Sequence, residues 1–322
     1  MNQSLDSKYK FPPISLLKQY EAESTQVDID EQSPQVVSLF SVINSEEFQK
    51  STYDLPIAMG KTTTNEIFMF DLVKAPNLLI GGTNGQEKTM ALNTIITSLL
   101  YKKHPAELKF VLIDSKKEEL SIYSNIEKYF LAKLPNIENP IVNNVAKTID
   151  TLNSLILEMD NRYDLLEKAN VCNVQEYNNK FVNLLMPYIV IVIDELSDLI
   201  LEGGKEIELP IARIAQMAQA TGIHIIIASQ YPSTDIFTGT IKYNCSTRIA
   251  FKVASAIDSR IILDKIGANT LVGHGDMMFS QEDNMTCVQC AFVDTLGIKR
   301  ISEYIGKQQW DSLVFELPEY YF

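Results

Sequence analysis

Short apolar runs alternate with helical repeats along the chain from about residue 54. Five of these runs are apolar at almost every position and are bounded by turn residues: 67–70, 77–80, 110–114, 189–194 and 223–228. Strands that are covered on both faces need continuous apolar runs, whereas half-exposed strands alternate. The pattern therefore predicts an α/β fold in which a parallel sheet lies between two helix layers.

Segments with a period of about 3.6 residues lie between these runs. One apolar stripe predicts a long helix that ends near Lys168: Val145, Ile149, Leu152, Ile156, Met159 and Tyr163. Helices are also expected at 90–101 and 207–220, and Asp258 is expected to open a further one. Later strands are predicted at 248–253, 276–279 and 288–293.

The same pattern divides the chain into three parts. Residues 1–53 are polar and show little periodicity, so an extended arm or short helices are expected there. Residues 54–306 are expected to form the α/β domain, and residues 307–322 a C-terminal tail. With 322 residues, 46% of them hydrophobic, the chain can bury a substantial core.

Charge and cysteine content narrow the possible functions. The net charge of −13 argues against binding nucleic acid over the whole surface, although a locally basic loop or pore remains compatible with it. No uncharged apolar run of about 18 residues and no secretory signal occurs, so we expect a cytoplasmic protein without a membrane segment. The Cys287-Val-Gln-Cys290 pair fits packing within a strand better than a zinc site.

The segment after the second run differs at one position from a phosphate-binding loop. The pattern G-x-x-x-x-G-K-[S/T] is met by Gly82, Lys88 and Thr89, but Glu87 replaces its second glycine. In such a loop, backbone amides cradle phosphates at the positive end of a helix. Lys88 would neutralise the β and γ phosphates of ATP, and the Thr89 hydroxyl would ligate Mg²⁺. The residues expected to bind this cofactor are Gly82, Thr83, Asn84, Gly85, Gln86, Glu87, Lys88 and Thr89. The alternative is a strand-to-helix turn whose glycines only relieve backbone sterics.

Two further strand ends carry polar groups. Asp194 and Glu195 follow the fourth run, where Asp194 would hold the magnesium shell and Glu195 would polarise an attacking water. Gln230 follows the fifth run, in position to sense a γ-phosphate. Since ligands bind beyond the carboxyl ends of parallel strands, the three strand ends together predict a P-loop ATPase of the additional-strand class. The alternative for the two acids is that they cap the next helix.

With these residues, the chain resembles the motor domain of the FtsK/SpoIIIE family of double-stranded DNA translocases. The resemblance spans about residues 53–306 and rests on several segments, including 55–61 (LPIAMGK), 193–196 (IDEL), 211–218 (IARIAQMA), 247–251 (TRIAF) and 273–277 (GHGDM). It implies a RecA-like P-loop fold, and hexameric rings that thread duplex DNA and use ATP. Lys242 and Arg248 lie in the segment that corresponds to the family's pore-facing region, which makes them candidates for contact with DNA phosphates. The alternative there is a solvated loop with two ordinary charges.

The chain departs from the family's pattern at its chemical positions. Besides Glu87, the residues Gln219, Tyr231 and Cys287 stand where the family usually has arginine, and Ser115 stands where it has proline. A carboxylate about 5 Å from a phosphate, at an effective dielectric near 20, costs roughly 3 kcal/mol per charge pair. Loss of an arginine finger costs about 10³ to 10⁵ in rate in other phosphoryl-transfer enzymes. We therefore expect weakened ATP binding and slow or absent hydrolysis.

Two main hypotheses follow from the residues and the resemblance. The first is an FtsK-like motor subunit that binds ATP and double-stranded DNA, in a homo-hexameric ring or with an intact paralogue. The second is a pseudo-ATPase, a binding module that assembles with partners and hydrolyses nothing. A weaker third is a P-loop protein that moves another cargo. In each case we expect the family's membrane anchor, most of its α subdomain and its γ winged helix to be missing.

Overall fold

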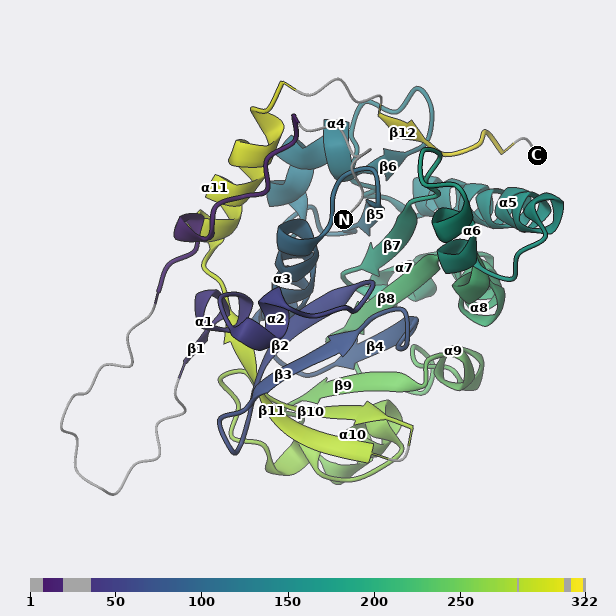
Figure 1. Cartoon of the computed structure of the whole chain (residues 1–322). Helices are drawn as coiled ribbons and strands as arrows, with labels where there is room; N and C mark the ends of the chain where they lie inside the picture. Colours follow the sequence, from purple (N-terminus) through teal and green to yellow (C-terminus); the bar gives the residue numbers. More distant parts are fainter. Residues whose placement is uncertain (1–7, 20–35, 283, 310–313, 321–322) are drawn as a thin grey trace.

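A mixed β-sheet forms the centre of the protein and carries helices on both faces (Figure 1). The computed structural model describes residues 8–19, 36–282, 284–309 and 314–320. The strands in chain order are β1 (Val37–Ser38), β2 (Pro56–Thr62), β3 (Ile67–Asp71), β4 (Asn77–Gly81), β5 (Leu108–Ile113), β6 (Ala132–Lys133), β7 (Tyr188–Ile193), β8 (Ile223–Ser229), β9 (Thr247–Phe251), β10 (Asp276–Gln281), β11 (Asn284–Phe292) and β12 (Phe315–Glu316).

The helices connect these strands and pack on the sheet. The α-helices are α1 (Leu39–Ile43), α2 (Glu46–Gln49), α3 (Gly85–Lys102), α4 (Glu127–Phe130), α5 (Val145–Ala169), α6 (Val174–Lys180), α7 (Leu196–Gly203), α8 (Lys205–Met217), α9 (Gly239–Asn244), α10 (Ala256–Leu263) and α11 (Thr295–Gly306). Short 3₁₀ helices occur as η1 (Ile14–Leu16), η2 (Ser121–Ile126), η3 (Ala218–Thr221) and η4 (Ala268–Thr270).

One half of the sheet is parallel, in the order β9-β4-β8-β7-β5. The predicted runs 77–80, 110–114, 189–194 and 223–228 are the strands β4, β5, β7 and β8 of this half, so the parallel sheet is confirmed for them. Strand β8 lies between β4, which leads to the loop at 82–89, and β7, which leads to Asp194. This insertion is the arrangement expected of an additional-strand P-loop fold.

The other half of the sheet is antiparallel, which corrects the prediction of a wholly parallel sheet. Strands β10, β11, β2 and β3 continue from β9 in the order β9-β10-β11-β2-β3, and each neighbouring pair is antiparallel. The run 67–70 is β3, at the edge of this half. Only residues 63–66 join β2 to β3, and so short a connection permits a hairpin but no crossover to a parallel neighbour.

The core has two layers, one on each face of the sheet. Leu78 and Ile80 of β4 belong to a cluster shared with α3 and α11, whereas Leu79 belongs to a cluster shared with α5, α7 and α8. Successive side chains of a strand point to opposite faces, so a run that is apolar throughout serves both layers at once.

Parts of the described segments outside residues 54–306 pack against this domain. Leu39 and Phe48, of α1 and α2, belong to the α3 layer of the core. Lys10 exchanges two hydrogen bonds with Gln308 at 2.9 and 2.8 Å, and β12 pairs with β6. Every helix in the described residues is too short or too polar to cross a lipid bilayer.

Candidate nucleotide site

The loop after β4 packs closely against the neighbouring strand β9. A Cβ on Gly82 would come within 2.8 Å of the Cβ of Phe251, so this position needs glycine. Thr83 is fixed by two hydrogen bonds to the carbonyl of Lys252, from its N–H at 3.3 Å and from its hydroxyl at 3.1 Å. The start of the loop is therefore bound to the end of β9.

Helix α3 begins earlier than the sequence predicted, at Gly85 instead of Met90. Asn84 is its N-cap, and the side-chain oxygen of Asn84 accepts a hydrogen bond from the N–H of Gln86 at 3.1 Å. Glu87 and Lys88 lie in the first turn of the helix, and the N–H of Lys88 donates to the carbonyl of Asn84 over 3.5 Å. The second half of the loop thus forms the capped first turn of α3, and phosphate binding by residues 82–89 stays a prediction.

The side chain of Glu87 is directed at a distant turn. Its carboxylate is buried, and its Oε1 accepts a hydrogen bond from the N–H of Gly275 at 2.9 Å. Its Oε2 is also buried and has no hydrogen-bond partner. The expected repulsion of phosphates assumed that this carboxylate faces the bound nucleotide, and the observed orientation differs from that assumption.

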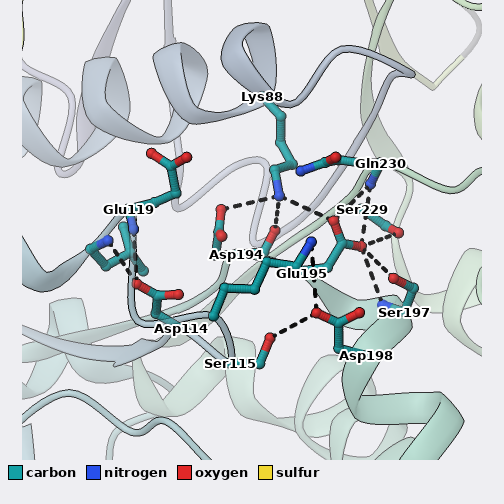
Figure 2. A network of polar contacts seen from close by, with 12 residues as sticks. Lys88, Asp114, Ser115, Glu119, Asp194, Glu195, Ser197, Asp198, Ser229 and Gln230 are labelled. Atoms are coloured by element: carbon teal, nitrogen blue, oxygen red, sulfur yellow. Dashed lines mark hydrogen bonds and ion pairs between the residues drawn. The ribbon is translucent and has the colours of Figure 1, made fainter.

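Lys88 lies at the centre of a buried ionic cluster that Figure 2 shows. Its Nζ donates to the backbone carbonyl of Asp194 at 2.6 Å and forms ion pairs with Asp194 Oδ1 and Glu195 Oε2, both at 3.2 Å. The side chains of all three residues are at most 2% exposed. The ends of β4 and β7 therefore meet through these side chains, as the sequence predicted.

The carboxylate of Glu195 is saturated by hydrogen bonds. Oε1 accepts from the hydroxyls of Ser229 at 2.6 Å and Ser197 at 2.8 Å, and Oε2 accepts from the N–H of Gln230 at 3.1 Å and from Lys88. Burial alone would raise the pKa of Glu195, but Lys88 and these donors outweigh it and hold the pKa below its usual value. Glu195 is also the N-cap of α7, so the alternative of a helix cap holds for this acid.

Burial destabilises the ionised carboxylate of Asp194. Burial raises the pKa of Asp194 to about 6; Lys88 counteracts this rise, and the charges of Asp114 and Glu119 add to it. Asp194 Oδ1 has the ion pair with Lys88 as its polar contact, and the hydroxyl oxygen of Thr89 is buried without a hydrogen-bond partner. Thr89 follows Lys88 in sequence and Asp194 contacts Lys88 in space, and both oxygens are of the type that Mg²⁺ prefers.

The fit to a metal is limited to these oxygens. Within the part of the chain that the structure describes, no group of three or more His, Cys, Asp or Glu side chains is placed to hold a metal ion. Mg²⁺ commonly uses one or two protein oxygens and takes the rest from phosphates and water, so the chemistry of Thr89 and Asp194 fits the predicted ligands of that kind of site.

Three residues of the cluster were not singled out by sequence as site residues. Asp114, at the end of β5, is fully buried and accepts from the N–H groups of Lys117, Glu119 and Leu120 at 2.9 to 3.0 Å. The sequence could have indicated Asp114 as a site residue, because it ends an apolar run just as Asp194 does. Ser197 and Ser229 carried no such signal, since serine is common after strands.

Gln230 lies against the loop. A Cβ on Gly85 would come within 2.6 Å of Gln230 Nε2, so the amide of this side chain covers the start of α3. The structure thus brings together the predicted residues Lys88, Asp194, Glu195 and Gln230 at one edge of the sheet.

The three positions where arginine was expected lie in different surroundings. Gln219, in η3, precedes β8 and is therefore at the opposite edge of the sheet from Gln230. Tyr231 is 61% exposed beside Gln230. The thiol of Cys287 donates to Asp276 Oδ1 at 3.2 Å, and burial together with Asp276 raises its pKa to about 11.

Lys242 and Arg248, the candidate DNA contacts, both pair with Asp264. Arg248 also donates to the carbonyls of Cys245 and Lys242, both at 3.0 Å. The side chains of Lys242 and Arg248 are only 17% and 12% exposed. In this conformation both charges make internal contacts, so the side chains are less exposed than the alternative of a solvated loop assumed.

Comparison with known proteins gives one family. The FtsK/SpoIIIE family model matches residues 38–234. The DNA translocase FtsK of Chlorobaculum tepidum is 46% identical over 285 residues, which cover 88% of this chain and 35% of that protein. The DNA translocase FtsK of Helicobacter pylori strain J99 is 41% identical over 288 residues, covering 88% and 33%. The chain thus spans about a third of the length of these relatives.

Solved structures support the fold. The pCW3 conjugation coupling protein TcpA, in its monomer form with ATPγS, has a TM-score of 0.69 at 24% identity and covers 82% of this chain and 71% of its own. The cytoplasmic domain of the type VII secretion ATPase EccC from Thermomonospora curvata has a TM-score of 0.72 at 19% identity, covering 88% and 36%. At these identities, the likeness establishes the α/β fold alone.

Proposed function

The chain belongs to the FtsK/SpoIIIE family, and on this basis we propose that it is a motor subunit that binds ATP with Mg²⁺ and acts on double-stranded DNA. Its relatives are DNA translocases by name, which supports DNA as the substrate. The chain corresponds to about a third of each relative, so this proposal concerns the part that would bind nucleotide.

The observation that carries the proposal is the buried hydroxyl of Thr89, which has no partner, together with the buried carboxylate of Asp194, whose ion-pair partner is Lys88. Thr89 Oγ1 is buried without a hydrogen bond, which costs about 1–3 kcal/mol, and Asp194 Oδ1 has only its ion pair with Lys88 at 3.2 Å. Asp114, Asp194 and Glu195 also place three carboxylates in a region with one buried lysine. A divalent cation would satisfy both oxygens and offset the excess negative charge.

The roles of the other residues follow from their positions. Lys88 is the cation available to the β and γ phosphates, once they compete with Asp194 and Glu195 for its ammonium group. Mg²⁺ would supply charge neutralisation of the phosphates and would be held by Thr89 and Asp194. Gln230, lying over Gly85, is placed to contact the terminal phosphate.

Slow hydrolysis is part of the proposal. Glu195 could polarise water only through a free lone pair, and Lys88, Ser197, Ser229 and Gln230 occupy its oxygens in this conformation. The same observation favours a second candidate function, a pseudo-ATPase that binds partners without turnover. A homo-oligomeric ring, or assembly with an intact paralogue, is proposed for both candidates because Tyr231 is exposed beside the site, where a neighbouring subunit could supply a basic residue.

The first test replaces the hydroxyl that has no partner. Thr89→Val removes an oxygen that forms no hydrogen bond in the structure, so stability without ligand should not fall. Nucleotide affinity should lose its dependence on Mg²⁺, a loss of at least about tenfold for one metal ligand. Titration of a fluorescent ATP analogue, with and without Mg²⁺, measures this effect. Thr97→Val, a change of the same kind further along α3, is the matched control and should retain Mg²⁺-dependent binding.

ATP turnover then separates the two candidates. DNA-stimulated hydrolysis that Glu195→Gln abolishes would support a motor. Mg²⁺-dependent binding without turnover, in the presence and absence of duplex DNA, would support the pseudo-ATPase. If the native chain shows no Mg²⁺-dependent nucleotide binding, the motor is refuted.

A further inference from the structure

We infer that Glu87 is a positioning residue: its carboxylate fastens the first turn of α3 to the turn at 273–275 and thereby opposes the opening of the loop for nucleotide. The inference rests on the proposed function, because it describes regulation of the same site. It differs from the expectation drawn from sequence, in which Glu87 acts through repulsion of phosphates.

The contact joins two segments that are far apart in the chain. Glu87 Oε1 accepts from the N–H of Gly275 at 2.9 Å, across 188 residues, and the side chain of Glu87 is 5% exposed. A Cβ on Gly273 would lie 3.6 Å from the same oxygen, so the carboxylate rests directly on this turn. A hydrogen bond from a buried amide to a carboxylate is among the stronger ones in proteins.

The turn that receives Glu87 has a rare backbone conformation. Gly273, His274 and Gly275 have φ values of 96°, 57° and 90°, three consecutive residues in the left-handed region. Such a conformation persists only where surrounding contacts hold it. Besides Glu87, the turn is held by Gln289, whose side-chain amide donates to the carbonyl of His274 at 2.8 Å, and by the N–H of Cys290, which donates to the carbonyl of Gly275 at 2.8 Å.

The same contact constrains the loop. Glu87 is in the first turn of α3, where an acidic side chain also favours the helix dipole. To wind residues 85–88 around phosphates, the peptide groups of this turn would have to rotate, and the Glu87 side chain would leave Gly275. Nucleotide binding would then have to overcome both the lost hydrogen bond and the loss of support for the turn.

Glutamine separates this explanation from charge repulsion. Glu87→Gln removes the negative charge but keeps an oxygen that can accept from Gly275, whereas Glu87→Ala removes both and keeps a good helix former. If the link is what matters, the Gln variant should resemble the native chain more than the Ala variant does. If charge is what matters, the two variants should behave alike.

The experiment measures two quantities on the full chain with each variant. Hydrogen exchange of the Gly275 amide reports on the link itself, and titration with Mg²⁺-ATP reports on the loop. Glu87→Ala should accelerate exchange at Gly275 at least about tenfold and should tighten Mg²⁺-ATP binding by a similar factor. Glu87→Gln should change both quantities by a clearly smaller factor. Circular dichroism checks that each variant is folded.

Failure of the inference is distinguishable from failure of the proposed function. If exchange at Gly275 is unchanged in Glu87→Ala, or if Gln and Ala tighten ATP binding equally, the inference is overturned while ATP binding stands. If no variant binds ATP, the proposed function fails. The hydrogen bond between Glu87 and Gly275 then cannot regulate nucleotide binding, even if the exchange of the Gly275 amide depends on it, so the inference is refuted as well.

Discussion

Asp194→Asn should make the protein more stable at neutral pH. Burial raises the pKa of Asp194 from 3.8 to about 6, which means that the folded protein disfavours the ionised carboxylate. The stability contributed by this group is complete below about pH 4, where it is protonated in both states, and is lost as the pH rises through about 6. At about 1.36 kcal/mol per pH unit, the shift corresponds to about 3 kcal/mol.

The assay is urea unfolding of the native chain and of Asp194→Asn from about pH 4 to about pH 8. The variant should gain little near pH 4, and its advantage should grow to about 3 kcal/mol above pH 6. Asparagine keeps the backbone carbonyl that Lys88 contacts at 2.6 Å, so the lysine retains one of its partners. Asp160→Asn, which changes a half-exposed acid paired with Arg213, is the control and should shift stability by less than about 1 kcal/mol.

A variant that is less stable than the native chain at pH 7 to 8, or an advantage that does not depend on pH, would refute the reasoning. The first result would mean that the ion pair with Lys88 outweighs the cost of burying Asp194, and the second that the gain does not come from the ionisation of Asp194. The ligand response gives an independent check: Mg²⁺-ATP should stabilise the native chain against urea more than it stabilises Asp194→Asn, because the variant lacks one of the two proposed magnesium ligands.

Two further substitutions test the charged clusters. Lys88→Met should destabilise the protein by about 3–5 kcal/mol, because it leaves Asp194 and Glu195 buried without their cation; unchanged urea stability would contradict this. Asp264→Asn should cost only about 1 kcal/mol, since asparagine tolerates the φ of 60° at this position, but it releases Lys242 and Arg248 from their acid partner. If these two residues contact DNA phosphates, the slope of log affinity against log salt should steepen by up to about 2, and an unchanged slope would argue against them as DNA contacts.

The parallel half of the sheet could be predicted from sequence because its strands are buried on both faces. Each run that is apolar throughout, such as 189–194, serves two core layers, and no other element of that length needs this pattern. The antiparallel half was assigned the wrong direction at 67–70, since an apolar run alone does not reveal the direction of its neighbour. The four-residue connection from β2 was the signal that decides it.

Helix starts were predicted less well, because capping residues were overlooked. Asn84 is the N-cap of α3. It precedes the apolar residues on which the expected start at Met90 was based. Asp258 was expected to open a helix, whereas Ser255 is the N-cap of α10 and Asp258 completes a capping box with it. In both cases the cap residue preceded the predicted start, by six positions for α3 and by three for α10.

The grouping of Lys88, Asp194, Glu195 and Gln230 followed from topology, because the carboxyl ends of adjacent parallel strands meet at one edge. The link of Glu87 to Gly275 could not be predicted in the same way. It joins the parallel half of the sheet to the connection before β10, and only the packing of α3 beside that connection brings the two residues together.

The hydrogen bonds of Glu195 bind this acid to the end of β8. Ser229 is the last residue of that strand and Gln230 follows it, and both donate to the same carboxylate. Any displacement of Gln230 that carries its backbone along must therefore strain or break bonds to Glu195, each worth about 1.5–3 kcal/mol for a charged acceptor. Glu195 and the end of β8 are therefore mechanically coupled. The carboxylate of Glu195 loses these hydrogen bonds only when Ser229 and Gln230 move away from it.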